Sequence, residues 1–276
     1  MALTILNPFP GFKFGCDPEL FVLNREGIAV TAEGLLPGTK EAPYKVMQGA
    51  VQVDGMAAEF NIDPAETFEE FNDNIESVLA QLKKMLPKGY KLSCVPAVEF
   101  SEEEWAKAPE NAKVLGCNPD FNAWTGSPNE SPDTTSRPRL RTASGHLHIG
   151  WTEGEDMNEE HLRNCTDLVK QLDWYLGGWS LLQDEDKTRR LLYGKAGACR
   201  FKPYGVEYRV LSNFWIPTMT KRLHVWNRMQ RALTNMRTVY MPDKAKTQNF
   251  RLVDCIDNSH VDTNLFHAYS NPLIRI

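Results

Sequence analysis

The stretch RTASGHLHIGW, residues 141–151, contains two histidines and otherwise has the apolar content of a buried strand. Because successive side chains of a strand point to opposite faces, His146 and His148 share one face, and Leu147 and Ile149 share the other. Neutral imidazole is a common ligand of metals and also a good partner for phosphate. The pair could therefore bind a metal or a phosphate, or could be two hydrogen-bonded histidines on a polar sheet surface.

Charged side chains alternate in the same way in three other strand-like segments, FGCDPELFV, VQVDGMAAEFN and GVEYRVLS. On any single strand, a charge most often marks only the solvated face. If the four strands lie side by side, one sheet face collects carboxylates, imidazoles and a guanidinium, from Asp17, Glu19, Glu59, His146, His148, Glu207 and Arg209. Clustered carboxylates repel one another unless cations lie between them. Carboxylates with one or two imidazoles suit Mg²⁺ or Mn²⁺, which also bind phosphates.

Asp54 permits two interpretations. With Gly55 it could form a two-residue hairpin turn, or its carboxylate could join the polar face. Because Asp-Gly is favoured in such turns, we expect the turn.

A basic segment, RRLLYGKAGACRFKPYGVEYR at residues 189–209, leads into the strand of Glu207, although the net charge of the chain is −5. The planar guanidinium group binds phosphate through paired hydrogen bonds, so this segment predicts a phosphate-binding site. The residues expected to bind phosphate are Arg190, Lys195, Arg200 and Arg209. Lys202 and Arg189 are more simply explained as solvated charges of a hairpin. The chain has no Walker A or G-x-G-x-x-G motif.

The helices and strands that position these residues are predicted from the spacing of apolar residues. Amphipathic helices are expected at residues 64–86, 158–176 and 218–239. The first should begin with a capping box of Asp63 and Glu66, with Pro64 at its first position, and the second should stop at Gly177-Gly178. Strands are expected at residues 14–23, 28–32, 50–61, 91–99, 144–151, 197–202 and 205–212. Single helices separated by several strands indicate an α+β fold, with an antiparallel sheet and helices packed on one face.

Two further segments differ from the rest of the chain. TGSPNESPDTTSRPRLR at 125–141 is rich in Ser, Thr and Pro and has almost no apolar side chains, which predicts a long flexible loop. Because it precedes the histidine strand, it could act as a lid over a site. The alternative is a disordered loop without such a role. The tail at 241–276 has no assignment, and no linker divides residues 1–276 into two domains.

Composition excludes several classes of protein. With 276 residues, 42% of them hydrophobic and 24% charged, the chain is typical of a globular domain, and no apolar run approaches the ~20 residues of a membrane span. The start lacks the pattern of a signal peptide, so we expect a cytoplasmic protein. The negative net charge argues against nucleic-acid binding, except to a modified base as a substrate. The six cysteines form no C-x-x-C pair, which argues against structural zinc and disulfides.

The chain resembles the phage-encoded carboxylate–amine ligases (COOH–NH2 ligase type 2) of the glutamine synthetase and glutamate–cysteine ligase superfamily. The resemblance lies in FGCDPELFV, VQVDGMAAEFN, GCNPDFNAW, SGHLHIG and RRLLYGKAGACRFKPYGVEYRVLSNFW, and it covers residues 12–240. It implies a glutamine synthetase-like catalytic domain whose concave sheet face binds ATP and Mg²⁺. It also implies host cytoplasm as the location.

The resemblance implies roles for individual residues. The implied metal ligands are Glu19, Glu59, His146 and Glu207. The expected contacts of ATP are His148, Arg190, Lys195, Arg200 and Arg209. Catalytic roles are expected for Arg209, Arg200 and Glu59. One histidine of the pair should bind metal and the other phosphate, and which of His146 and His148 has which role stays open.

The expected activity is an ATP- and Mg²⁺-dependent ligation, with Mn²⁺ as an alternative metal. ATP would phosphorylate a carboxylate, and an amine would attack the acyl phosphate to give an amide. A kinase on the same sheet would stop at the phosphorylated product, and a phage interaction protein without catalysis is the non-enzymatic alternative. The expected partners are small-molecule or peptide carboxylates and amines, and a homo-oligomer is compatible with the sequence.

Overall fold

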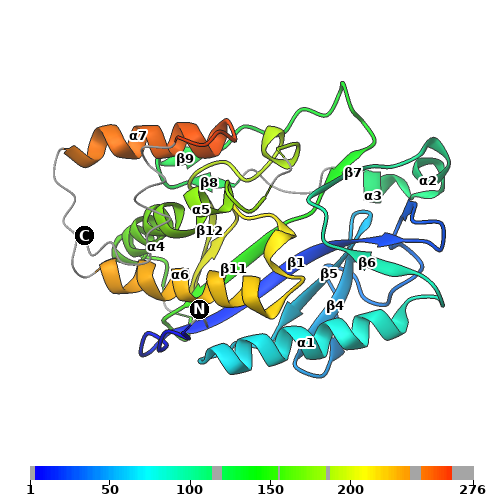
Figure 1. The fold of residues 1–276 in the computed structure, drawn as a ribbon, viewed down its shortest axis with the longest axis horizontal. Helices are drawn as coiled ribbons and strands as arrows, with labels where there is room; N and C mark the ends of the chain where they lie inside the picture. Colours follow the sequence, from blue (N-terminus) through cyan, green and yellow to red (C-terminus); the bar gives the residue numbers. More distant parts are fainter. Residues whose placement is uncertain (1–3, 114–119, 155, 185–186, 237–243, 263–276) are drawn as a thin grey trace.

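Figure 1 shows the chain as a computed structural model in which a large sheet packs against helices. The structure describes residues 4–113, 120–154, 156–184, 187–236 and 244–262. Every strand pairing in these ranges is antiparallel. The predicted α+β class with an antiparallel sheet is therefore confirmed.

The long strand β1 lies in the middle of the sheet, between β5 and β11. From one edge to the other, the strands are β3 (Tyr44–Val46), β4 (Gly49–Asp54), β5 (Ala57–Ile62), β1 (Lys13–Leu23), β11 (Gly145–Gly150), β13 (Gly205–Tyr208), β12 (Ala198–Lys202), β8 (Phe121–Asn122) and β9 (Ser127–Pro128). The far end of β1 also pairs with β2 (Ala29–Val30) and β6 (Lys91–Ser93). A separate pair consists of β7 (Ala97–Glu99) and β10 (Leu140–Thr142).

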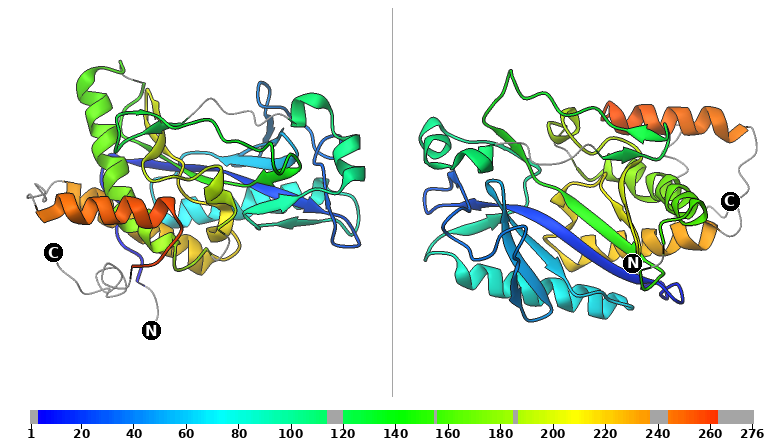
Figure 2. Two further views of the ribbon diagram at one scale, coloured as in Figure 1. Left: turned by 90° about the horizontal axis from the view of Figure 1, so that it is seen from above. Right: turned by 180° about the vertical axis from the view of Figure 1, so that it is seen from behind.

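Three long helices cover one face of this sheet. They are α1 (Phe68–Met85), α4 (Glu159–Leu172) and α6 (Met219–Met236). Helix α1 packs on β4 and β5, α4 packs on β12 and β13, and α6 contacts both helices (Figure 1). Alternate strand residues such as Phe14, Leu147 and Val206 are fully buried in the shared apolar core. In the view from behind, β1 and β11 lie in front of α6, which leaves their other face for polar side chains (Figure 2).

Helix α1 begins later than the sequence pattern indicated. Its N-cap is Thr67, which forms a capping box with Glu70, so the box predicted at residues 63–66 is wrong. The cause is a pair of backbone hydrogen bonds between Ala65 and Phe14, of 2.8 and 2.9 Å, which hold the preceding segment extended against β1. A strand contact thus overrides a local helix signal.

The second helix does not stop at its two glycines. Helix α4 ends at Leu172, and the chain continues through a π-helical turn at Asp173–Gly177 and the short α5 (Gly178–Ser180). A Cβ atom on Gly177 would lie 2.9 Å from the hydroxyl of Tyr208. Glycine is therefore needed here for a close approach to β13 rather than to end the helix.

The other predicted boundaries differ in smaller ways. The segment at 50–61 is a hairpin, β4–β5, whose turn residues follow Asp54, and 91–99 divides into β6 and β7. The loop at 125–141 begins with β9 and ends in β10, so its two ends are not free. The unassigned tail contains α7 (Lys244–Asp257). The remaining helical segments are α2 (Glu102–Lys107), α3 (Glu110–Lys113) and two short 3₁₀ turns, Arg189–Leu191 and Asn213–Trp215.

Among the described residues, five cysteines carry free thiols: Cys94, which is partly exposed, and the buried Cys16, Cys165, Cys199 and Cys255. The described helices include none with both the length and the apolar character needed to cross a bilayer.

Candidate active site

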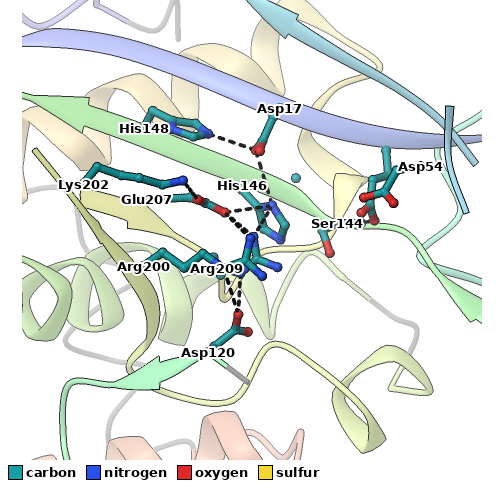
Figure 3. Close-up of polar contacts among 12 residues, drawn as sticks. Asp17, Asp54, Asp120, Ser144, His146, His148, Arg200, Lys202, Glu207 and Arg209 are labelled. Atoms are coloured by element: carbon teal, nitrogen blue, oxygen red, sulfur yellow. Dashed lines mark hydrogen bonds and ion pairs between the residues drawn. The ribbon is translucent and has the colours of Figure 1, made fainter. Parts of the chain in front are cut away.

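The register of neighbouring strands brings the predicted site residues that lie on these strands to one face of the sheet (Figure 3). The cross-strand partners on this face are Asp17 with His146, Glu19 with Glu59, His148 with Glu207, and Arg200 with Glu207. Their chain neighbours point to the helices, as Tyr208 does with no exposed surface. The shared face predicted from the alternation is present.

The first group on this face, which we call cluster 1, consists of Asp17, His146 and Glu207. One ligand atom from each lies within 4.8 Å of the others. His146 Nδ1 is 3.3 Å from Asp17 Oδ1 and 3.6 Å from Glu207 Oε1. Asp17 Oδ1 is a buried atom that lies near imidazole nitrogens but makes no well-aligned hydrogen bond. This oxygen therefore has the capacity to accept a cation.

Electrostatics keep the carboxylates of cluster 1 ionised. Burial alone would raise the pKa of Asp17, but the charges of His148 and His146 outweigh it and hold that pKa well below its usual value. Burial and the charge of Asp17 also act to raise the pKa of Glu207, and Arg209 and the two histidines lower it to about 2. Both groups are anionic at neutral pH.

The second group, cluster 2, consists of Glu19, Asp54 and Glu59, again with ligand atoms within 4.8 Å of one another. The backbone N–H of Ser144 donates to Glu19 Oε2 at 2.7 Å. Asp54 is the last residue of β4 before the hairpin turn and also belongs to this cluster. The turn was expected correctly, but placing Asp54 in the turn instead of on the polar face was wrong.

Like charges are poorly compensated in cluster 2. Burial raises the pKa of Glu19, and the charge of Asp54 adds to this against the opposing charge of His146. Burial, and then the charges of Asp17, Glu19 and Asp54, raise the pKa of Glu59 well above its usual value. A cation bound between these carboxylates would offset the repulsion that adds to the effect of burial.

Basic side chains border cluster 1. Arg209 is buried, donates from Nε to Asp120 Oδ1 at 2.6 Å, and also bonds to Glu207. Arg200 lies 3.9 Å from Asp120 and 4.0 Å from Glu207. Lys202 Nζ is 2.9 Å from Glu207 Oε2, so the interpretation of Lys202 as a solvated charge is wrong. Asp120 was missed, because β8 is too short to show a periodic pattern.

The other basic residues of the segment at 189–209 do not reach the clusters. Arg190 is buried and donates to Ser180 Oγ at 2.7 Å, and Lys195 donates to the backbone of Asp257 at 2.9 Å. The phosphate contacts predicted for Arg190 and Lys195 therefore have no support in the geometry. Arg189 is fully buried and bonds to neutral acceptors, so it is not a solvated hairpin charge either.

A pocket of about 550 Å³ adjoins both clusters. Its lining includes Asp17 of cluster 1, Glu59 of cluster 2, and His148, whereas the other members of the clusters lie outside it. The aromatic side chains of Trp151 and Tyr204 form part of its wall. Sites for small molecules and cofactors have volumes of this order and combine apolar walls with a few polar groups.

Comparisons with known proteins add little to this site. No known family model matches the chain, and a comparison with curated proteins finds no match either. Among solved structures, the chain is similar to a bifunctional glutathione synthetase from Pasteurella multocida, with 10% identity and a TM-score of 0.46. The similarity covers 93% of this chain and 45% of that protein, so this chain spans less than half of its length. A similarity of this size carries no functional argument, so the function is inferred from the site residues alone.

Proposed function

We propose that the protein is an ATP- and Mg²⁺-dependent carboxylate–amine ligase that forms an amide through an acyl phosphate. The observation that carries this proposal is the pair of carboxylate clusters on one sheet face, both bordering a pocket of about 550 Å³. Two metal sites beside a pocket of nucleotide size are suited to the transfer of a phosphoryl group. In the proposal, residues 1–276 form a single catalytic domain of glutamine synthetase-like type.

The donor sets fit divalent metals. Mg²⁺ binds to carboxylate oxygens and keeps several waters, and Mn²⁺ accepts imidazole as well. Cluster 1 offers Asp17, Glu207 and His146, and its orphaned oxygen would gain a partner. Cluster 2 offers three carboxylates, two of which have pKa values raised by burial and mutual repulsion. Bound ions would act as Lewis acids on the phosphate oxygens.

The reaction would proceed in two steps. An oxygen of the substrate carboxylate attacks the γ-phosphorus of ATP, the bond to the β-phosphate oxygen breaks, and ADP leaves. The amine then attacks the acyl carbon, phosphate leaves, and the nitrogen loses a proton. Arg209 and Arg200 border cluster 1, where they would stabilise the charge on the transferring group. Asp120 holds the guanidinium of Arg209 in one orientation.

The resemblance to phage-encoded carboxylate–amine ligases agrees with this arrangement. The residues that it implies as metal ligands belong to the two clusters: Glu19, Glu59, His146 and Glu207. The geometry favours His146 for the metal, because it belongs to cluster 1, and His148 for phosphate, because it lines the pocket.

Turnover with pooled substrates tests the proposal. The protein is incubated with ATP, Mg²⁺, a pool of carboxylates and a pool of amines, and ADP release and condensation products are followed by mass spectrometry. We expect an amide product that Glu59→Gln abolishes and that Glu26→Gln, on an exposed loop, leaves unchanged. A stable phosphorylated product that ignores the amine pool would instead identify a kinase. A protein that binds no nucleotide would overturn both assignments.

A further inference from the structure

Tyr204 lies where it can control one of the two histidines. It follows Pro203 in the tight turn between β12 and β13. Its carbonyl oxygen accepts from the backbone N–H groups of Trp151, at 2.9 Å, and Thr152, at 3.3 Å. A Cβ on the next residue, Gly205, would lie 2.1 Å from the carbonyl oxygen of Ile149, so only glycine allows the turn to approach β11 so closely. The backbone of Tyr204 is thus fixed against the end of β11.

From this position, the phenol of Tyr204 reaches His148. Its hydroxyl makes a short hydrogen bond with His148 Nδ1, and both side chains line the pocket. The other ring nitrogen, Nε2, is 3.1 Å from Asp17 Oδ1, but the two atoms are not aligned for a hydrogen bond. One nitrogen of His148 is therefore engaged by Tyr204, while the other lies beside Asp17 at the edge of cluster 1.

The phenol determines which nitrogen carries the proton. Burial, with the negative charges of Glu207 and Asp17, raises the pKa of Tyr204, so the phenol keeps its proton. When His148 is neutral, this phenol can donate to an unprotonated Nδ1, which leaves the imidazole proton on Nε2, 3.1 Å from Asp17 Oδ1. When His148 is charged, both nitrogens carry protons. In both of these states Nε2 carries a proton and is a hydrogen-bond donor rather than a metal ligand.

His146, two residues away on the same face, has different neighbours. Its Nδ1 lies 3.2 Å from Arg209 Nη1 and within 3.6 Å of oxygens of Asp17 and Glu207. An unprotonated Nδ1 can accept from Arg209 or bind a cation held by the two carboxylates. The side chains around the two rings thus separate their roles.

We propose that Tyr204 is a positioning residue that holds His148 with a proton on Nε2, so that His148 donates to an anionic group in the pocket rather than serving as a second metal-binding histidine. This inference rests on the proposed function only in taking the anionic group to be a nucleotide phosphate. The tautomer of His148 is independent of the function.

The tautomer is measured first, by long-range ¹H–¹⁵N correlation spectra of histidine-labelled protein at increasing pH until the His148 ring is neutral, because burial acts to lower its pKa but the charge of Asp17 raises that pKa above the usual value. His148→Gln identifies the His148 signals. We expect the wild type to show protonated Nε2 and unprotonated Nδ1, and Tyr204→Phe to show a mixture of tautomers. Tyr44→Phe, half-exposed on the edge strand β3, should match the wild type. Protonated Nδ1 in the wild type, or an unchanged tautomer in Tyr204→Phe, would overturn the inference.

Binding of the non-hydrolysable ATP analogue AMP-PNP with Mg²⁺ is measured second, by calorimetry. We expect Tyr204→Phe to weaken binding about tenfold, as loss of orientation of a hydrogen bond to a charged group would do. The amide of His148→Gln donates without help from Tyr204, so adding Tyr204→Phe to His148→Gln should cause no further loss. Additive losses in the double variant would contradict the positioning role. A wild type that does not bind AMP-PNP would overturn the proposed function and the phosphate contact, while the spectra still decide the tautomer.

Discussion

Replacing Glu59 with glutamine should stabilise the metal-free protein and abolish its response to Mg²⁺. The side chain is in cluster 2, and the residue is only 8% exposed. Burial and neighbouring carboxylates raise its pKa well above the usual value. The folded protein therefore binds more protons than the unfolded chain, and the free energy of unfolding falls as pH rises from about 4.5 through the raised pKa. Glutamine removes this loss of stability.

The size of the effect follows from the spacing of the charges. Two unit charges 4.8 Å apart repel by about 3 kcal/mol at an effective dielectric constant of about 20. Protonation and water relieve part of this repulsion in the metal-free protein. We therefore expect Glu59→Gln to raise the free energy of unfolding by about 1–3 kcal/mol at about pH 8, which raises Tm by about 2–6 °C in a chain of this length.

Thermal unfolding in the presence of a chelator, and then with increasing Mg²⁺, measures both effects. We expect Mg²⁺ to raise the Tm of the wild type and to leave that of Glu59→Gln nearly unchanged, because ligands that bind only the folded state stabilise it. The gain from the substitution should shrink as pH falls towards about 4.5, the ordinary carboxyl value, because Glu59 then becomes protonated in the unfolded chain as well. The exposed Glu26→Gln serves as the control. The reasoning is refuted if Glu59→Gln is less stable than the wild type at about pH 8 without metal, or if Mg²⁺ stabilises both equally.

Three further predictions concern Asp173, which is buried and bonds to Tyr208, and the rest of the site. Burial raises the pKa of Asp173 to about 7, so it costs stability as pH rises from about 4 to 7, and Asp173→Asn, whose amide can donate to Tyr208, should flatten that slope in thermal melts at several pH values. Arg209→Lys keeps the charge but loses the fork that binds Asp120, so kcat should fall roughly 10²–10³-fold with a smaller change in nucleotide binding; equal losses in both would contradict a role in the transition state. Amide hydrogen exchange in the loop at 125–141 should slow when nucleotide and acceptor bind, and equal exchange with and without them would exclude a lid.

The polar face was predictable from the sequence because two simple rules combine there. Strand residues alternate between faces, and adjacent antiparallel strands place their charged positions opposite one another. Asp17 and His146 are such a pair, and so are Glu19 and Glu59. Alternation cannot give the register, however, so the division of these side chains into two clusters became visible only in the structure.

Sequence reasoning failed where the chain leaves the long strands. Asp120 precedes a strand of two residues, and Tyr204 lies in a turn, so no periodicity points to either. Arg190 and Lys195 were grouped with Arg200 because they are close in sequence, but β12 begins only at Ala198, and the preceding turn directs both side chains elsewhere. Proximity in sequence predicts a shared site only within one regular element.

The two histidines show the same limit at the scale of single atoms. His146 and His148 are equivalent by alternation, because both project from β11 towards the polar face. What separates them comes from the β12–β13 hairpin: Glu207 lies beside His146 Nδ1, and Tyr204 bonds to His148 Nδ1. An imidazole whose Nδ1 accepts from a phenol has its proton on Nε2, whereas one beside two carboxylates is suited to share a cation with them. In the proposal, the hairpin rather than the histidine strand itself therefore gives one ring to metal and the other to phosphate, and Tyr204 is the residue whose loss should make the two alike.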